Sequence, residues 1–306
     1  MSFDEQLTDI IKKDRNIRDS SLNAYIRNIK KLLKIADLEP TIENMKTLFN
    51  DKDKVIELLQ GKQPSTIRNY IASIIVAGGE GYSELLELYQ KQNLERVGNG
   101  KKTEAMEKNW TSLQELRDVL QGYISQIDFK KKTLTKKEMD LLKKYVVGSL
   151  YIGDDANPPL RLDYIMEIIS KPDYNRLTEK EKREKNYLVV QSKMKKFFSL
   201  GEYKTSDKYG IKEIPVGKDL NKVLNTWLKY NTSKYLLPNN KGEQITSNAL
   251  TKLIQSTFAP TGKKISASML RHIFITEKFP PMTKEKEQIA DKMLHSKSQQ
   301  GDYAKD

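Results

Sequence analysis

The chain has 306 residues, of which 37% are hydrophobic and 31% are charged, and its formal net charge is +13. This excess of basic side chains favours a polyanionic partner, with DNA or RNA ahead of a membrane surface, over a surface that is merely rich in lysine. The absence of cysteine excludes a disulfide scaffold and a cysteine-based zinc site, and two histidines leave little for a histidine-based metal site.

Residues 1–17 are polar and mixed in charge, which is unlike a signal peptide, and we interpret them as an N-terminal tail. No apolar run approaches the ~18–20 residues that are needed to cross a membrane. We therefore expect a protein that is intracellular or packaged in a particle, that is not secreted, and that has no membrane partner.

Residues 18–95 predict a compact, all-helical domain. Apolar side chains recur at helical spacing from Leu22 to Leu38, and Asp19 or Ser20 is expected to cap this helix. Further helical patterns cover residues 42–49, 55–59, 67–77 and 82–92. The basic residues among the helices include Arg27, Lys30, Lys31 and Arg68. They could line a phosphate backbone, and a solvated helix face explains any single one about as well.

Residues 96–108 predict a basic linker, because flexible glycines alternate there with polar and basic residues. The second domain is expected to span residues 109–306, with its first helices at 113–127 and 139–151. Pro158-Pro159 breaks the chain, and the next helix is expected to start near Leu160. That start would put Arg161 in the first helical turn, where free backbone N–H groups favour anions.

The middle of the second domain changes its period. Tyr187–Val190 predicts a strand, and residues 197–204 and 211–216 predict a β-hairpin with Lys204 near its tip. Helical patterns follow at residues 220–229, 247–257, 267–279 and 284–294. The expected fold class is therefore mainly α with a small antiparallel β-sheet (α+β).

The C-terminal region gathers side chains that are suited to chemistry on a phosphodiester. It contains Ser268, Arg271, both histidines (His272 and His295) and Tyr303. Arginine offers planar donors to two phosphate oxygens, histidine donates near neutral pH, and tyrosine can act as a nucleophile that stays covalently attached.

Five motifs in this order resemble the tyrosine recombinase (phage integrase) family, most closely its members from large DNA viruses and virophages. The family has an arginine that opens a helix, a lysine on a β-hairpin, a His-x-x-Arg-type box, a Leu-Gly-His-Ser-like motif and a later tyrosine. The matching residues here are Pro159-Leu160-Arg161-Leu162-Asp163, Tyr203-Lys204-Thr205, Met269-Leu270-Arg271-His272, Met293-Leu294-His295-Ser296 and Tyr303.

The resemblance implies a helical core-binding domain at 18–95, which clamps DNA, and a mixed catalytic domain at 109–306. It implies a site-specific recombinase or integrase that breaks and rejoins double-stranded DNA, with no metal, ATP or other cofactor. The family acts as a homotetramer on synapsed DNA, and the same assembly is expected here. The protein is expected wherever its target DNA lies, in cytoplasm, host nucleus or virion.

The resemblance also implies the role of each catalytic residue. Tyr303 would be the nucleophile, forming a 3′-phosphotyrosine bond. Arg161 and Arg271 would hold the nonbridging phosphate oxygens, and Lys204 would be the general acid. The remaining expected members are two further donors, Ser268 and His295, and two supporting residues, Asp163 and His272.

Three departures from the family pattern leave alternatives open. Ser268 stands where the family has histidine or lysine, Leu294 replaces a usual glycine, and the spacing from His295 to Tyr303 is one residue shorter. A type IB topoisomerase with the same residue set and a catalytically impaired DNA-binding relative are the alternatives. Lys208 and Lys212 are rivals of Lys204 as the acid, and Tyr209 and Tyr235 are the next candidates for the nucleophile.

Overall fold

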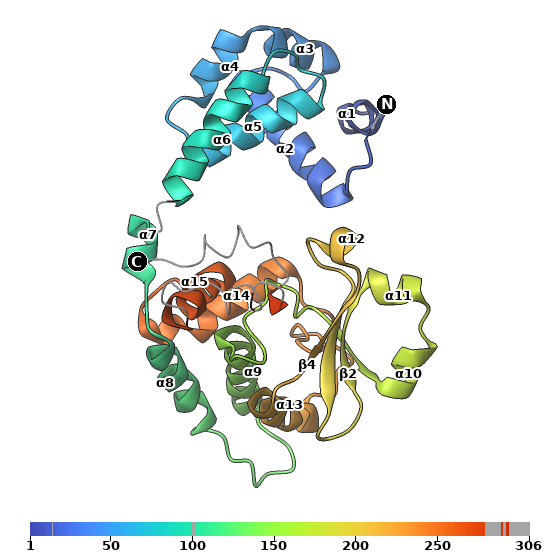
Figure 1. The fold of residues 1–306 in the computed structure, drawn as a ribbon, viewed down its shortest axis with the longest axis vertical. Coiled ribbons are helices and arrows are strands. Elements are labelled where there is room, and N and C mark those ends of the chain that lie inside the picture. Colours follow the sequence, from blue (N-terminus) through green and yellow to red (C-terminus); the bar gives the residue numbers. More distant parts are fainter. Residues whose placement is uncertain (14, 99–101, 279–288, 290–291, 294–306) are drawn as a thin grey trace. The chain divides into compact units, whose positions relative to one another are not determined.

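The structure, a computed structural model, describes residues 1–13, 15–98, 102–278, 289 and 292–293. The chain divides into two compact units, Met1–Asn99 and Gly100–Asp306 (Figure 1). Each unit has its own hydrophobic core.

The regular secondary structure in the described part of the first unit is entirely helical. Its helices are α1 (Phe3–Lys12), α2 (Asp19–Ile35), α3 (Ile42–Asn50), α4 (Lys52–Leu59), α5 (Pro64–Val76) and α6 (Ser83–Gly98). Their apolar faces meet in one core. Within it, the buried Tyr82 hydroxyl donates a hydrogen bond to the Phe49 carbonyl oxygen at 2.8 Å.

The N-terminal segment differs from the tail that the sequence suggested for residues 1–17. Ser2 and Glu5 form a capping box at the start of α1, and Leu7 and Ile11, four residues apart, are 0% and 1% exposed. One face of α1 therefore belongs to the core of the first unit. The next helix begins at Asp19, with Arg18 at the N-cap, so Asp19 stabilises the positive end of the helix from its first turn instead of capping it.

The segment expected to be a linker, residues 96–108, also contains helical residues. Helix α6 continues to Gly98, and α7 (Glu104–Asn109) follows, capped by the Thr103 hydroxyl, which accepts the Met106 N–H. The division between the two units falls at residues 99–100.

The second unit combines helices with a small sheet. Its elements are α8 (Leu113–Ile124), α9 (Lys136–Ile152), β1 (Glu167–Ser170), α10 (Lys171–Arg176), α11 (Glu179–Glu184), β2 (Asn186–Val190), β3 (Lys196–Leu200), α12 (Ser206–Tyr209), β4 (Lys212–Pro215), α13 (Lys218–Tyr230), α14 (Ser247–Thr257), a 3-10 turn (Ala259–Thr261) and α15 (Ala267–Lys278). This confirms the predicted class, mainly helical with a small sheet. The helix predicted at 284–294 falls almost entirely outside the described residues.

The sheet has four strands in the order β1-β2-β3-β4 (Figure 1). Strands β2, β3 and β4 pair antiparallel, and the β3–β4 pair is the predicted hairpin. Strand β1 was not predicted, and it pairs parallel with β2, so the sheet is mixed. The edge of β1 that faces away from β2 is covered by the segment 234–236. The N–H of Ile168 donates to the Lys234 carbonyl at 2.7 Å, and the N–H of Leu236 donates to the Met166 carbonyl at 2.9 Å.

Helices α8, α9, α13, α14 and α15 form the helical part of this unit, and α9 packs against each of the other four (Figure 1). The end of α9 meets the sheet through aromatic contacts. The ring of Tyr164 lies edge-on to those of Tyr151 and Phe198, with centroids 5.3 Å apart in both pairs. These contacts fix the segment between α9 and β1, which carries Arg161.

Candidate functional site

Arg161 lies in an irregular turn between α9 and β1, not in the first turn of a helix as predicted. The turn is held from within: Asp154 Oδ1 accepts the N–H groups of Ala156 and Asn157 at 2.9 and 2.7 Å, and the Asp154 N–H donates to the Asn157 carbonyl at 3.1 Å. Gly153 starts the turn with a φ of 69°, a left-handed conformation that favours glycine. The half-buried Arg161 therefore rests on a fixed backbone.

Arg271 lies in the middle of α15 and is 2% exposed. Its helix is apolar on the buried side, where Leu270, Ile273 and Phe274 are each 0% exposed. Burial, together with the positive charge of Arg161, lowers the pKa of Arg271 to about 9, although Asp163 and Tyr151 oppose the shift. The fold therefore holds two guanidinium groups within electrostatic range although they come from distant parts of the sequence.

Asp163 is the carboxylate beside this pair. Burial raises its pKa to about 6, although the charges of Arg161 and Arg271 and a backbone hydrogen bond from Arg161 favour the ionised form. Asp163 Oδ2 is buried, and no hydrogen-bond partner for it lies in the described part of the chain. Asp163 is thus coupled to both arginines, and the two guanidinium groups offer several donors that suit an anion such as phosphate.

Tyr151, near the end of α9, is a member of this cluster that the sequence did not reveal. It is 0% exposed, and burial, with the charges of Tyr164 and Asp163, raises its pKa well above the ordinary value, while Arg271 opposes this shift. In the sequence it belongs to an apolar helix pattern, so only its position in space places it beside Asp163 and Arg271.

Lys204 is exposed and lies in the loop between β3 and α12. Strand β3 ends at Leu200, so the strand is shorter than the predicted 197–204, and a four-residue helix, α12, occupies the expected turn. The neighbouring Tyr203 is 4% exposed and its hydroxyl donates to the Gly210 carbonyl at 2.8 Å, which closes the loop at its base.

The structure places the remaining predicted residues as follows. Ser268 is an exposed residue in the first turn of α15, three positions before Arg271, and His272 is half-buried directly after Arg271. His295 and Tyr303 lie outside the described residues. The alternative Tyr209 is 38% exposed at the end of α12, and the alternative Tyr235 is in the segment that covers β1.

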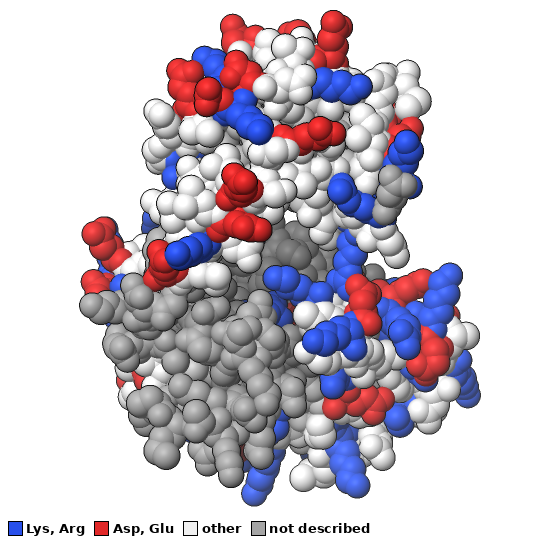
Figure 2. Space-filling view, turned by 45° about the horizontal axis from the view of Figure 1, so that its top comes forward, with Lys and Arg blue, Asp and Glu red and all other residues white. Residues whose placement is uncertain are grey.

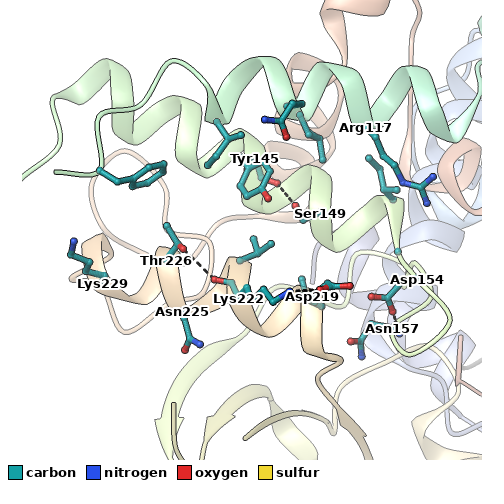
Figure 3. A pocket seen from close by; sticks show the side chains of 18 of the residues that line it. Arg117, Tyr145, Ser149, Asp154, Asn157, Asp219, Lys222, Asn225, Thr226 and Lys229 are labelled. Carbon is teal, nitrogen blue, oxygen red and sulfur yellow. Dashed lines mark hydrogen bonds and ion pairs between the residues drawn. The ribbon is translucent and has the colours of Figure 1, made fainter. Parts of the chain in front are cut away.

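A groove in the described part of the second unit is lined by neither of the two arginines. It is a groove of about 1000 Å³ between α8, α9 and α13 (Figure 3). Arg117 and Lys229 lie at its two ends, and Asp154 and Asn157, from the turn before Arg161, form one of its walls. The groove is therefore distinct from the arginine pair.

Basic side chains are mixed with carboxylates on the surface of this unit (Figure 2). On α10 and α11, three ion pairs balance part of the positive charge, namely Arg176–Asp173, Lys182–Glu179 and Lys180–Glu184. The described residues contain no group of three or more acidic or histidine side chains arranged to hold a metal ion. They also contain no helix that is long and apolar enough to span a membrane.

Comparison with known proteins gives matches in structure alone, to five solved chains. No family model and no curated protein matches the sequence. A solved structure described as XerA recombinase is 13% identical, with a TM-score of 0.42, over 98% of this chain and 92% of that chain. A likeness at this level carries no weight for function, which has to be argued from the residues of the site.

Proposed function

We propose that this protein is a site-specific DNA recombinase or integrase that breaks and rejoins duplex DNA through a 3′-phosphotyrosine intermediate. The observation that supports it best is the pair Arg161 and Arg271, held together against their mutual repulsion, with Arg271 only 2% exposed. A phosphate bound between the two guanidinium groups would relieve their mutual repulsion.

The chemistry follows from the charge that develops on the phosphate. The Tyr303 hydroxyl releases its proton to solvent as its oxygen attacks: a new P–O bond forms, and the bond from phosphorus to the 5′ oxygen breaks. The two guanidiniums stabilise the negative charge on the nonbridging oxygens, and His295 and Ser268 are further proposed donors. Lys204 gives its proton to the leaving 5′ oxygen. Rejoining reverses these steps, and the energy of the broken bond is kept in the phosphotyrosine.

The proposed substrate is double-stranded DNA, bound by the second unit together with the helical first unit. The net charge of +13 supports an electrostatic contribution from phosphate contacts. Affinity should then fall steeply with salt concentration, because each neutralised phosphate releases counterions. A homotetramer on two synapsed duplexes is part of the proposal.

The decisive experiment uses a nicked suicide substrate, on which cleavage traps the covalent adduct. Wild type should become attached to DNA, and Tyr303→Phe, which lacks only the hydroxyl, should bind DNA without attachment. An adduct that persists in Tyr303→Phe would identify another nucleophile, with Tyr209 and Tyr235 tested next. A wild type that binds but never attaches would be the catalytically impaired DNA-binding relative.

The same preparation separates the recombinase from the type IB topoisomerase. A recombinase should exchange strands between two duplexes that carry its site, whereas a topoisomerase relaxes supercoiled DNA without joining two duplexes. Because the site sequence is unknown, the flanking DNA of the source element is the substrate of choice. Relaxation without exchange would favour the topoisomerase.

A further inference from the structure

Asn186, the first residue of β2, joins two loops through a buried side chain. It is 5% exposed. Its Nδ2 donates to the carbonyl oxygens of Asp163 at 3.1 Å and Glu202 at 2.9 Å, and its Oδ1 accepts the Glu202 N–H at 2.9 Å. Both amide hydrogens and one oxygen lone pair are therefore used, all on backbone groups that are not part of a regular strand or helix.

The positions of these partners relate Asn186 to the proposed reaction. Asp163 follows Arg161 by two residues, and Glu202 precedes Lys204 by two residues. The two loops are also coupled electrostatically, because the negative charge of Glu202 contributes to the raised pKa of Asp163. One amide thus connects the turn that carries an arginine of the proposed phosphate site with the loop that carries the proposed general acid.

The backbone next to Glu202 is held in place as well. The N–H of Gly201 donates to the Lys185 carbonyl at 3.3 Å. A Cβ atom at Gly201 would lie 1.8 Å from the Lys182 carbonyl oxygen, so no other residue fits there without a shift of the backbone. Together with the buried Tyr203, these contacts fix the base of the loop that carries the exposed residue Lys204.

A second asparagine connects the same two segments at their other ends. Asn157, labelled in Figure 3, is 3% exposed. Its Nδ2 donates to the Pro215 carbonyl at 2.8 Å, and its Oδ1 accepts the Gly217 N–H at 2.6 Å. The segment before Arg161 is therefore linked to the end of β4, just as the segment after Arg161 is linked to the end of β3.

We infer that Asn186 is a positioning residue that sets the place of Lys204 relative to Arg161. This inference rests on the proposed function. The acid has to reach the leaving oxygen of the same phosphate whose nonbridging oxygens the arginines hold, and an error of about 1 Å in such a placement can cost about 100-fold in rate. The turn that carries Arg161 keeps its contacts through Asn157 and Tyr164, so loss of the Asn186 amide should displace Lys204 more than Arg161.

Asn221 offers a matched control with a purely structural connection. It is also 5% exposed, its Nδ2 donates to the Lys193 carbonyl at 3.1 Å, and its Oδ1 accepts Lys196 Nζ at 2.7 Å. These bonds tie the β2–β3 connection to α13, and none of the three residues lies in the loops that carry Arg161 and Lys204. Asn221→Ala removes a comparable buried amide without disturbing the proposed link.

The test compares single-turnover cleavage of an ordinary phosphodiester with that of a 5′-bridging phosphorothiolate, whose thiolate leaves without a proton. Asn186→Ala should slow the ordinary substrate at least tenfold more than the phosphorothiolate, as Lys204→Ala does. The double variant should be no slower than Lys204→Ala alone, because both changes remove the same step. Asn221→Ala should slow both substrates equally or neither, at a similar loss of stability in urea.

Three results would overturn the inference: equal slowing of both substrates by Asn186→Ala, additive losses in the double variant, or the same selective loss in Asn221→Ala. Asn186→Asp is the second variant should Asn186→Ala not fold. It keeps the acceptor for the Glu202 N–H and places an oxygen against two carbonyls, so the same selectivity is expected. A wild type that forms no adduct on either substrate refutes the proposed function itself, whereas an active wild type with an unselective Asn186→Ala refutes only the inference.

Discussion

The positive charge of Arg161, in an irregular turn, lowers the pKa of Arg271, which is buried in the middle of α15. Like charges are rarely held so close in a largely buried place without a reason in function. Here the balancing carboxylate, Asp163, is itself destabilised by burial. The charges of these three residues are therefore coupled, and this coupling is the physical basis of the predictions on the arginines and on Asp163.

Replacing either arginine should impair cleavage more than binding. We expect Arg161→Ala and Arg271→Ala each to lower the single-turnover cleavage rate by about 10²–10³-fold, the usual cost of a donor to developing charge. The loss of DNA affinity should be smaller, because many other phosphate contacts remain. Arg117 is an exposed arginine at the end of the groove, and the Arg117→Ala variant is the control, which should cleave like wild type. Equal losses in rate and affinity would make the two arginines ground-state phosphate anchors instead.

Asp163 should make stability depend on pH in an unusual direction. The unfolded chain releases this proton near the ordinary pKa of 3.8, whereas the folded protein keeps it until about 6. Between these values the folded state binds more protons, so this group lowers the free energy of unfolding as pH rises from about 4 to 6. Asp163→Asn does not titrate. The stability of the variant minus that of wild type should therefore increase over this range, by up to about 3 kcal/mol, and stay level above pH about 7.

Urea unfolding at several pH values measures this difference. Both tryptophans, Trp110 and Trp227, lie in the second unit, so their fluorescence follows the unit that contains Asp163. A difference between variant and wild type that does not change with pH would show that Asp163 titrates alike in the folded and unfolded chain.

Lys204 should be needed only when the leaving group needs a proton. Lys204→Ala should block cleavage of an ordinary phosphodiester and spare a 5′-bridging phosphorothiolate. Lys208→Ala and Lys212→Ala are the matched controls, since they remove lysines from α12 and β4 of the same hairpin, and both should resemble wild type on both substrates. Slow cleavage of the phosphorothiolate by Lys204→Ala would assign the acid elsewhere and leave Lys204 as a phosphate contact.

Replacing a glycine with alanine should have opposite effects on stability at Gly148 and at Gly122. A Cβ atom at Gly148 in α9 would lie 2.2 Å from Leu120 Cδ2 of α8, so Gly148→Ala should lower the free energy of unfolding by about 1–3 kcal/mol through overpacking. Gly122 in α8 has no such neighbour within 4 Å, and Gly122→Ala should raise stability by up to about 1 kcal/mol through helix propensity. Urea unfolding followed by tryptophan fluorescence measures both. A stable Gly148→Ala would mean that α8 and α9 separate easily.

Most of the second unit's helices and the β3–β4 hairpin could be predicted, because their apolar residues repeat at a period that is visible within one short window. Strand β1 could not, because it has four residues and owes its conformation to pairing with β2 and to the covering segment at Lys234–Leu236. The error at Arg161 has the same origin: a proline pair is compatible with a helix start, and only the contacts of Tyr164 and Asp154 show that the chain forms a turn.

The residues of the candidate site likewise include some that the sequence predicted and some that it did not. Sequence motifs selected Arg161, Asp163 and Arg271, and the fold brings these three within range of one another. Sequence reasoning gave no reason to select Asn186 or Tyr151, because their partners are backbone groups or side chains from distant segments. Short polar motifs predict which side chains do chemistry, whereas the residues that hold them in place appear only when the loops are seen together.

The covered outer side of β1 has a consequence for how copies of this protein avoid aggregation. Within the described residues, the backbone from Lys234 to Leu236 covers that edge. The opposite edge strand, β4, is therefore the one to which a strand of another molecule could add. Strand β4 has four residues, begins with a lysine and ends with a proline that has no N–H to donate, features that discourage the pairing of sheets between molecules. Replacing that proline with a β-branched residue would be a poor choice in any attempt to stabilise the protein.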